Sequence, residues 1–236
     1  MKALILAAGL GSRLKNLTKS LPKALVKYRD REILDYQIDA LLSEGIYEIT
    51  IVSGYRSDIL TKFLKNKYSE ANIRVVENKI YNKSNSAYSS MKALSLTDTD
   101  YLHLNCDILF SKKILRKLIN SDNENIIAVR KDLAFSDAME NVIILKGRIV
   151  NMSLRNTSLT SYKAYGLAKI SNDALKENIS IYDSLSKKTQ LHENYFGLIR
   201  RALGKVDYNY LETDRKNLAE INTIEDLKVC TFKETA

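Results

Sequence analysis

The sequence predicts an α/β fold, a single domain over residues 1–236, in which helices flank a central mixed, mostly parallel sheet with a small β-hairpin extension. Two observations lead to this prediction. Short β-rich runs alternate with helical patterns through the first half of the chain, which is typical of βαβ units. In the second half, two strand-like runs flank Lys146-Gly147 and indicate a hairpin, so the sheet becomes mixed.

The first half begins with a buried strand over residues 2–6 that passes directly into a glycine turn. Residues 33–42 then place apolar side chains at helical spacing, and this pattern stops near Gly45. The same criteria predict strands at 49–52, 73–76 and 101–104 and helices at 57–68 and 88–96. The last of these strands leads into Asp107, and open α/β sheets bind ligands at the carboxyl ends of their strands.

The second half adds strands and helices in a less regular order. We predict strands at 126–130, 141–145, 148–152, 162–170 and 206–211, and helices at 112–119, 171–185, 193–203 and 223–229. No repeat, low-complexity block or proline-rich linker interrupts this order, so one continuous domain is the simplest interpretation.

Composition limits the classes of protein to which the chain can belong. Hydrophobic residues make up 45% of the chain, enough for a substantial core, while no apolar stretch approaches the roughly 18 residues that a membrane-spanning helix needs. Two cysteines without metal-ligand spacing suit a reducing compartment, so we expect a cytoplasmic protein with no membrane partner. The net charge of +9 comes from scattered basic residues, so we expect no nucleic-acid partner.

The strongest motif follows the first strand, where Gly9 and Gly11 let the backbone approach a phosphate chain. A dinucleotide-binding turn would need a third glycine where Leu14 stands, and a Walker loop would need Gly-Lys-Ser/Thr. Instead the loop supplies Arg13 and then Lys23, two cations that suit the charge on a triphosphate during displacement. We therefore expect nucleotide contacts from Leu6, Ala7, Ala8, Gly9, Gly11 and Ser12.

The combination of Gly9, Gly11, Arg13, Pro22 and Lys23 resembles the motif Gly-x-Gly-x-Arg, spacer, Pro-Lys of the pyrophosphorylase-like nucleotidyltransferases. The resemblance extends over nearly the whole chain and implies a Rossmann-like nucleotide-binding fold. It also implies a nucleotidyl transfer that releases pyrophosphate, with Arg13 and Lys23 as catalytic residues. The cofactor that it implies is a divalent metal, usually Mg²⁺.

The resemblance also indicates two metal ligands. Asp107 stands where the family keeps its metal-binding aspartate, and a strand-end carboxylate beside a triphosphate suits Mg²⁺. Residues 219–227 resemble the family's Glu-Ile-Asp-Thr-x-Glu-Asp-Leu, with Asn222 in place of the aspartate. The amide oxygen of Asn222 can ligate Mg²⁺, and Asn222 can also serve as the N-cap of the last helix. The sequence leaves both roles open.

Residues 78–90 resemble the Asn-x-x-Tyr-x-x-x-Asn-x-x-x-Ser pattern of cytidylyltransferases that act on phosphocholine, 2-aminoethylphosphonate and related phosphorylated amino compounds. The resemblance implies that the substrates are CTP and a small phosphorylated acceptor. Asn78, Asn85 and Ser89 are the predicted nucleotide contacts, because their side chains can bind a base edge, a ribose hydroxyl or a phosphate.

A cationic acceptor would need carboxylates or aromatic faces, for which the candidates are Tyr165, Glu193, Tyr195 and Glu140. His103 lies on an apolar strand and is expected in the core rather than in catalysis. Two alternatives stay open: a sugar-1-phosphate nucleotidyltransferase that uses UTP, dTTP or GTP, and a nucleotide-binding sensor without turnover. We also consider a homodimer.

Overall fold

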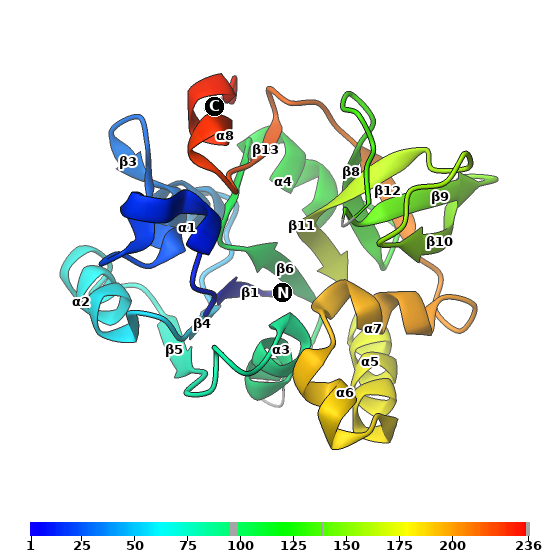
Figure 1. Ribbon diagram of the computed structural model, residues 1–236, viewed down its shortest axis with the longest axis horizontal. Helices are drawn as coiled ribbons and strands as arrows, with labels where there is room; N and C mark the ends of the chain where they lie inside the picture. The colour runs from blue at the N-terminus through cyan, green and yellow to red at the C-terminus, as the bar shows by residue number, and fades with distance from the viewer. Residues whose placement is uncertain (95–98, 138, 235–236) are drawn as a thin grey trace.

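The computed structural model describes residues 1–94, 99–137 and 139–234, and its central feature is a nine-stranded mixed sheet (Figure 1). At one edge, β5, β4, β1 and β6 lie side by side and parallel, and β11 follows in the opposite direction. Among the described strands of this sheet, only β10 and β11 run against the others, which confirms the predicted mixed, mostly parallel sheet with its hairpin. The strands are β1 (Lys2–Ala7), β4 (Ile49–Ser53), β5 (Ile73–Glu77), β6 (Tyr101–Asn105), β8 (Ile126–Arg130), β9 (Asn141–Leu145), β10 (Arg148–Ser153), β11 (Tyr162–Ile170) and β12 (Asn209–Glu212).

Helices cover both faces of this sheet, and β1 is therefore buried on both sides. Ile5 packs into the core under α1, α2 and α4, whereas the next residue, Leu6, packs into the core under α3, α5 and α7. A strand covered on both faces reads as a continuous apolar run, which explains the sequence of β1. These helices are α1 (Ile33–Ser43), α2 (Ser57–Lys67), α3 (Ser86–Leu94), α4 (Lys112–Ile119), α5 (Asn172–Ser184) and α7 (Tyr195–Ala202).

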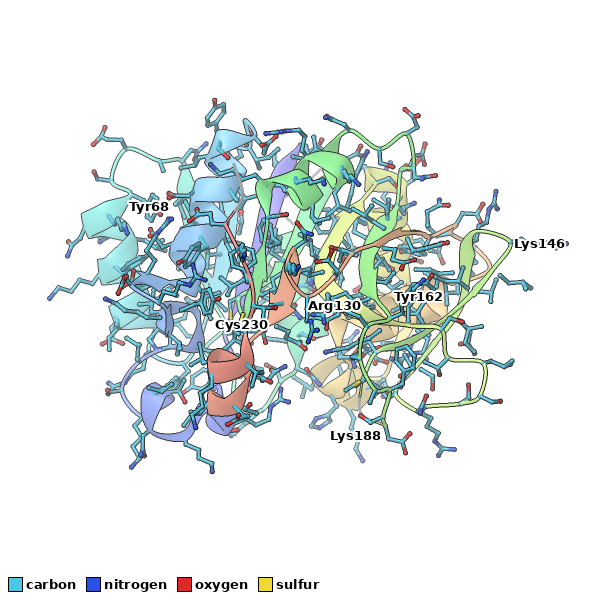
Figure 2. All side chains as sticks on the ribbon, turned by 90° about the horizontal axis from the view of Figure 1, so that it is seen from above. Tyr68, Arg130, Lys146, Tyr162, Lys188 and Cys230 are labelled. Atoms are coloured by element: carbon cyan, nitrogen blue, oxygen red, sulfur yellow. The ribbon has the colours of Figure 1, made fainter. Side chains whose placement is uncertain are left out.

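A second, two-stranded sheet brings the C-terminal part of the chain to the carboxyl end of β6. In it, β7 (Ile108–Phe110) pairs antiparallel with β13 (Leu218–Glu220), and α8 (Ile224–Val229) follows. The Ile221 N–H donates to the carbonyl of Asp107 at 2.8 Å. This pairing places the segment after β13 beside the strand-end carboxylate, although more than a hundred residues separate them in the sequence. Figure 2 shows the molecule from above, with Lys146 of the hairpin turn at one end and Tyr68, after α2, toward the other.

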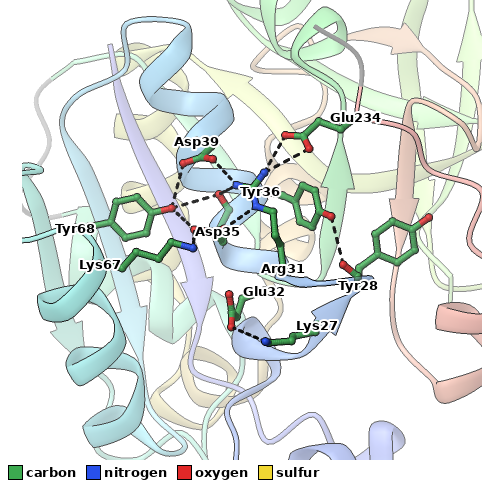
Figure 3. A network of polar contacts seen from close by, with 10 residues as sticks. All are labelled: Lys27, Tyr28, Arg31, Glu32, Asp35, Tyr36, Asp39, Lys67, Tyr68 and Glu234. Carbon is green, nitrogen blue, oxygen red and sulfur yellow. Dashed lines mark hydrogen bonds and ion pairs between the residues drawn. The ribbon is translucent and has the colours of Figure 1, made fainter.

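A polar network holds the chain's C-terminal segment on α1 (Figure 3). Asp35, which is buried on α1, accepts a hydrogen bond from Arg31 at 2.7 Å and another from the hydroxyl of Tyr68. Lys67 pairs at 2.7 Å with Oδ1 of this carboxylate, the oxygen that also accepts from Tyr68, while Arg31 bonds Oδ2. Arg31 also pairs with Glu234 at 3.1 Å, so the network joins α1, the end of α2 and the C-terminal segment.

The elements that sequence periodicity missed are short. They are η1 (Ser12–Thr18), η2 (Lys23–Leu25), β2 (Lys27–Tyr28), β3 (Arg31–Glu32), β7, β13 and α6 (Lys187–His192). The elements of two or three residues contain too few turns or alternations to show a period, and the non-helical backbone of Lys15 interrupts η1.

The longer elements differ from their predictions only at the ends. The helix predicted at 193–203 begins at Tyr195, because α6 and its own cap occupy the preceding residues. The strand predicted at 206–211 begins at Asn209. The helix predicted at 88–96 begins at Ser86, and residues 95–96 lie outside the described part of the chain. None of the described helices is both long and apolar enough to cross a membrane.

Candidate functional site

A cavity of about 420 Å³ opens at the carboxyl end of β1, where the glycine loop leaves the sheet. Gly11 has a left-handed backbone with a φ of 63°, and a Cβ at this position would lie 3.0 Å from the Cβ of Lys23. Glycine therefore allows the loop to approach Lys23 closely. Ala7 points to the other face of β1 and packs in the core. The remaining predicted loop contacts line the cavity: Leu6, Ala8, Gly9, Gly11 and Ser12.

Two cations and two polar acceptors meet in this cavity. The ammonium nitrogen of Lys23 lies 2.5 Å from Oδ2 of Asp107 and 2.8 Å from Oδ1 of Asn222. Nη2 of Arg13 donates to the same oxygen of Asn222 at 2.7 Å. The structure thus brings together the two residues predicted for catalysis and the two predicted for metal binding, which come from four separate parts of the chain.

Asn222 is not the cap of α8. Thr223 has that role, because its hydroxyl accepts a hydrogen bond from the N–H of Asp226 while the Asp226 carboxylate accepts one from the N–H of Thr223. The N-cap alternative for Asn222 is therefore wrong by one residue. The side chain of Asn222 is free of that task and faces the cation cluster.

Asp107 sits in a low-dielectric environment. Burial raises the pKa of its carboxyl group, and the ammonium of Lys23 opposes that rise. Its second oxygen, Oδ1, is buried and accepts no hydrogen bond within the described part of the chain. An unpaired buried oxygen costs free energy, so this atom is suited to a ligand that supplies a donor or a positive charge.

Glu220 belongs to the same cluster, and our sequence analysis did not predict it. Its carboxylate pairs with the ammonium of Lys163. Burial alone would raise the pKa of Glu220, but the charge of Lys163 holds it below its ordinary value. Glu220 stands two positions before Asn222, and a period of two on an extended chain would have indicated that both side chains share one face.

The resemblance implies Mg²⁺, and the oxygen ligands present here fit that ion. The unpaired oxygen of Asp107, the amide oxygen of Asn222 and the carboxylate of Glu220 are hard donors of the kind that Mg²⁺ prefers. Within the described residues, no group of three or more His, Cys, Asp or Glu side chains is placed to hold a metal by itself. Mg²⁺ tolerates this, because it commonly takes one or two carboxylates and completes its shell with phosphates and water.

A larger cavity of about 700 Å³ adjoins the first, and Arg13, Ser86, Asn105 and Asn222 line both. The cation cluster therefore lies at the junction between two compartments, one beside the glycine loop and one beyond it. Charged side chains line the wall of the larger cavity away from the loop: Arg130, Asp132, Glu140, Lys163, Arg215, Glu220 and Asp226.

The three predicted contacts from residues 78–90 have different positions. Asn78 is fully buried, lines neither cavity, and donates to the hydroxyls of Ser84 and Ser89 at 2.9 Å each. Asn78 thus holds the loop and the start of α3 in place. Ser89 and Asn85 line the smaller cavity, and the side chain of Asn85 also bonds the N–H of Ser86. Ser89 and Asn85 therefore lie beside the glycine loop and remain predicted nucleotide contacts.

Three of the four predicted acceptor residues line the larger cavity: Tyr165, Tyr195 and Glu140. Glu193 does not, because its carboxylate turns to Arg201 at 2.8 Å. The ring of Tyr195 stacks on His103 with centroids 3.6 Å apart. Burial lowers the pKa of His103 to about 3, so His103 is neutral, and its position in the core agrees with the expectation from the sequence.

Comparison with known proteins agrees with this geometry. The model of the MobA-like NTP transferase domain matches residues 3–170 of the chain. CTP:phosphoglutamine cytidylyltransferase from Campylobacter jejuni is 34% identical over 204 residues, which cover 79% of this chain and 79% of that enzyme. Choline-phosphate cytidylyltransferase from Streptococcus pneumoniae is 44% identical over 89 residues, which cover 38% of this chain and 37% of that enzyme.

A solved structure shares the fold over nearly the whole length. The structure of CTP:phosphocholine cytidylyltransferase from Streptococcus pneumoniae matches with a TM-score of 0.77 and 21% identity, covering 98% of this chain and 97% of that one. At this identity the likeness concerns the fold, namely the central mixed sheet with its flanking helices.

Proposed function

The chain belongs to the MobA-like NTP transferase family and is a nucleotidyltransferase; from this premise we propose that it transfers CMP from CTP to a small phosphorylated acceptor and releases pyrophosphate. The observation that carries the proposal is the cluster of Lys23, Arg13, Asp107 and Asn222 at the junction of the two cavities. The nucleotide would occupy the cavity beside the glycine loop, and the acceptor would occupy the larger one.

The proposed reaction is an in-line displacement at phosphorus. An oxygen of the acceptor's phosphate attacks the α-phosphorus of CTP and forms a new P–O bond, while the bond from that phosphorus to the oxygen bridging to the β-phosphate breaks. Pyrophosphate leaves with the bonding electrons. The nucleophile is already an anion at neutral pH, so the step needs no general base, and neutral, buried His103 has no place in it.

Lys23 and Arg13 would stabilise the negative charge that builds up on the transferred phosphoryl group and on pyrophosphate. Both side chains are held in the described structure by the carboxamide of Asn222, so they are oriented before substrate binds. When bound, Mg²⁺ would neutralise charge on the triphosphate. Asp107, Asn222 and Glu220 are the residues that we propose to hold it, by the donor atoms described above.

Support for CTP comes from the two cytidylyltransferases among the relatives, and support for the acceptor class comes from their names, which specify phosphoglutamine and choline phosphate. Phosphocholine, aminoalkylphosphonates and phosphorylated amino acids are therefore the acceptors to test first. We also propose a cytoplasmic location, because Cys106 and Cys230 are both free thiols, as expected in a reducing compartment.

A pyrophosphate-release assay tests the proposal. Each common nucleoside triphosphate is combined with each candidate acceptor and with hexose 1-phosphates, with Mg²⁺ present throughout. We expect release with CTP to exceed that with UTP, dTTP and GTP, and to require a phosphorylated acceptor. Release that is fastest with another nucleotide and a hexose 1-phosphate would favour the sugar-1-phosphate enzyme. Tight CTP binding without release from any combination would favour the sensor.

A further inference from the structure

We infer that the acceptor carries a carboxylate in addition to its phosphate, and that Arg130 and Arg215 bind this carboxylate in the larger cavity. The inference rests on the proposed function and adds to it the chemical class of the acceptor. It depends on which charged side chains of that cavity already have partners. The acidic side chains have them in the described structure, whereas Arg215 and one nitrogen of Arg130 do not.

Arg130 is a buried arginine, and one of the three nitrogens of its guanidinium group has no hydrogen-bond partner among the described residues. It is only 8% exposed; its Nε donates to Asp132 at 2.7 Å, and its Nη1 donates to the carbonyl of Leu218 at 2.8 Å. The remaining nitrogen, Nη2, makes no hydrogen bond within the described part of the chain and is accessible rather than buried. Because Arg130 lines the larger cavity, Nη2 is open to it. Figure 2 shows Arg130 near the middle of the molecule, between the labelled Cys230 and Tyr162 in that view.

Arg215 lines the same cavity and is attached to the same carboxylate. Its backbone N–H donates to the second oxygen of Asp132 at 3.1 Å, so Asp132 positions both arginines. The guanidinium of Arg215 has no partner among the described residues. The remaining Nη2 of Arg130, beside the unpaired guanidinium of Arg215, is suited to a planar anion such as a carboxylate, which can accept one hydrogen bond from Nη2 of Arg130 and two from the fork of Arg215.

The carboxylates of the cavity, in contrast, all have partners in the described structure. Glu140 pairs with Arg200 at 3.0 Å, Glu220 pairs with Lys163, and Asp132 pairs with Arg130. Asp226 accepts hydrogen bonds from two backbone N–H groups at the start of α8. An ammonium group on the acceptor would therefore meet carboxylates that already have a cation or N–H groups beside them, which weakens the attraction that they offer.

The aromatic faces that could hold a quaternary ammonium are also covered. Lys163 lies 4.5 Å and Arg130 lies 5.2 Å from the ring centroid of Tyr165. One face of Tyr195 is stacked on His103. A quaternary ammonium needs open aromatic faces, so these contacts disfavour phosphocholine and favour an acceptor whose second group is an anion.

The carboxylate site is close enough to the reacting end of the cavity to serve one small molecule. Arg130 bonds the carbonyl of Leu218, and Arg13 bonds the side chain of Asn222, four residues further along the chain. Four residues span at most about 14 Å, so the two anchor points, Leu218 and Asn222, are no farther apart than that. The arginine side chains and a small acceptor can bridge this distance. The phosphate would lie toward Asn222 and the carboxylate toward Leu218.

Matched acceptors test the inference. Pyrophosphate release from CTP is measured with O-phosphoserine against phosphoethanolamine, which lacks only the carboxylate, and with 3-phosphoglycerate against glycerol 3-phosphate, in which a hydroxymethyl group replaces the carboxylate. We expect the carboxylate member of each pair to have the higher kcat/KM by about tenfold or more, as one charged hydrogen bond supplies. Phosphocholine should be the poorest acceptor.

Two variants assign the residues. In Arg215→Gln, which changes an exposed side chain, KM for the carboxylate acceptors should rise about 10- to 100-fold while kcat/KM for their partners without a carboxylate stays unchanged. Arg130→Lys keeps the charge but loses the fork, and it should give the same pattern. Arg148→Gln is the control, because Arg148 is exposed, pairs with Asp207 and lines neither cavity.

The outcomes separate the two proposals. Pyrophosphate release with CTP that is equal or faster for phosphoethanolamine, glycerol 3-phosphate or phosphocholine would overturn the carboxylate inference and leave the cytidylyltransferase standing. A carboxylate preference that survives in both arginine variants would overturn the assignment to Arg130 and Arg215. Absence of release from CTP with every acceptor would overturn the proposed function, and the inference with it.

Discussion

Replacing Lys23 by methionine removes the ammonium group that joins Asp107 to Asn222 and keeps a side chain of similar length. In the wild-type protein this group bonds both residues at 2.5 and 2.8 Å, and the side chains of Lys23 and Asp107 are only 11% and 15% exposed. The change therefore affects an ion pair that is largely shielded from water. The Cβ of residue 23, which a side chain at position 11 would meet, is unchanged, so Gly11 still fits beside it and the loop should keep its shape.

Two effects of Lys23→Met can be estimated separately. Losing one fixed donor that stabilises charge in a transition state costs about 10²- to 10³-fold in kcat, or roughly 3–4 kcal/mol. Leaving Asp107 without its cation costs folding stability, and a full buried pair would cost about 3–5 kcal/mol on such a change. Because Asp107 keeps some contact with water, we expect a smaller loss of about 2 kcal/mol here, below that range.

Turnover of Lys23→Met should be measured with saturating CTP, acceptor and Mg²⁺ and expressed per folded molecule, with denaturant unfolding run on the same samples. Lys27→Met is the matched control, because Lys27 is 59% exposed, pairs with Glu32 at 3.7 Å and lines neither cavity. The control should stay within about twofold of the wild type. A Lys23→Met enzyme that keeps more than about a tenth of the wild-type kcat would remove Lys23 from the transition state.

Three further changes test other parts of the structure. Asp107→Ala should abolish Mg²⁺-dependent pyrophosphate release while the fold survives, and undiminished activity at limiting Mg²⁺ would give Asp107 a purely structural role. Asn222→Asp should bind Mg²⁺ more tightly and Asn222→Leu more weakly; an unchanged Mg²⁺ requirement in the leucine variant would rule out the ligand role. Burial alone would raise the pKa of Asp35, but hydrogen bonds from Lys67, Tyr68 and Arg31 hold it below its ordinary value. The ionised carboxylate therefore stabilises the folded protein fully above about pH 4. This contribution is lost as the pH falls through the lower, folded-state pKa. Asp35→Asn should therefore lower the free energy of unfolding by about 2 kcal/mol near pH 7 and by progressively less as the pH falls below about 4, and a loss that does not change with pH would contradict the ionic account.

The parts of the site that the sequence predicted are those that local patterns encode. The glycine loop follows directly on a buried strand, and the position of Gly11 is fixed by a left-handed backbone that favours glycine. Asp107 follows β6 in the same way. In both cases adjacent residues determine where the residue lies, whereas the metal-ligand roles of Asp107 and Asn222 rest on their resemblance to the family's motifs.

The parts that the sequence did not predict depend on contacts between distant segments. Glu220 reaches the cluster because β13 pairs with β7, two strands of three residues that lie more than a hundred positions apart. Arg215 lies at the larger cavity, where its backbone N–H bonds Asp132, which lies 83 residues earlier. Glu193 was predicted beside the acceptor, but no local pattern could show that Arg201 holds its carboxylate elsewhere.

The central claim is that the α-phosphorus of CTP becomes bonded to an oxygen of the acceptor's phosphate. ³¹P NMR of a reaction with CTP, Mg²⁺ and the best acceptor observes that bond directly. We predict two mutually coupled signals from a new diphosphate diester, together with pyrophosphate in equal amount, and neither product at a comparable rate with Lys23→Met. The appearance of CMP and pyrophosphate without the diester, or of a diester only from another nucleotide and a sugar 1-phosphate, would contradict the claim.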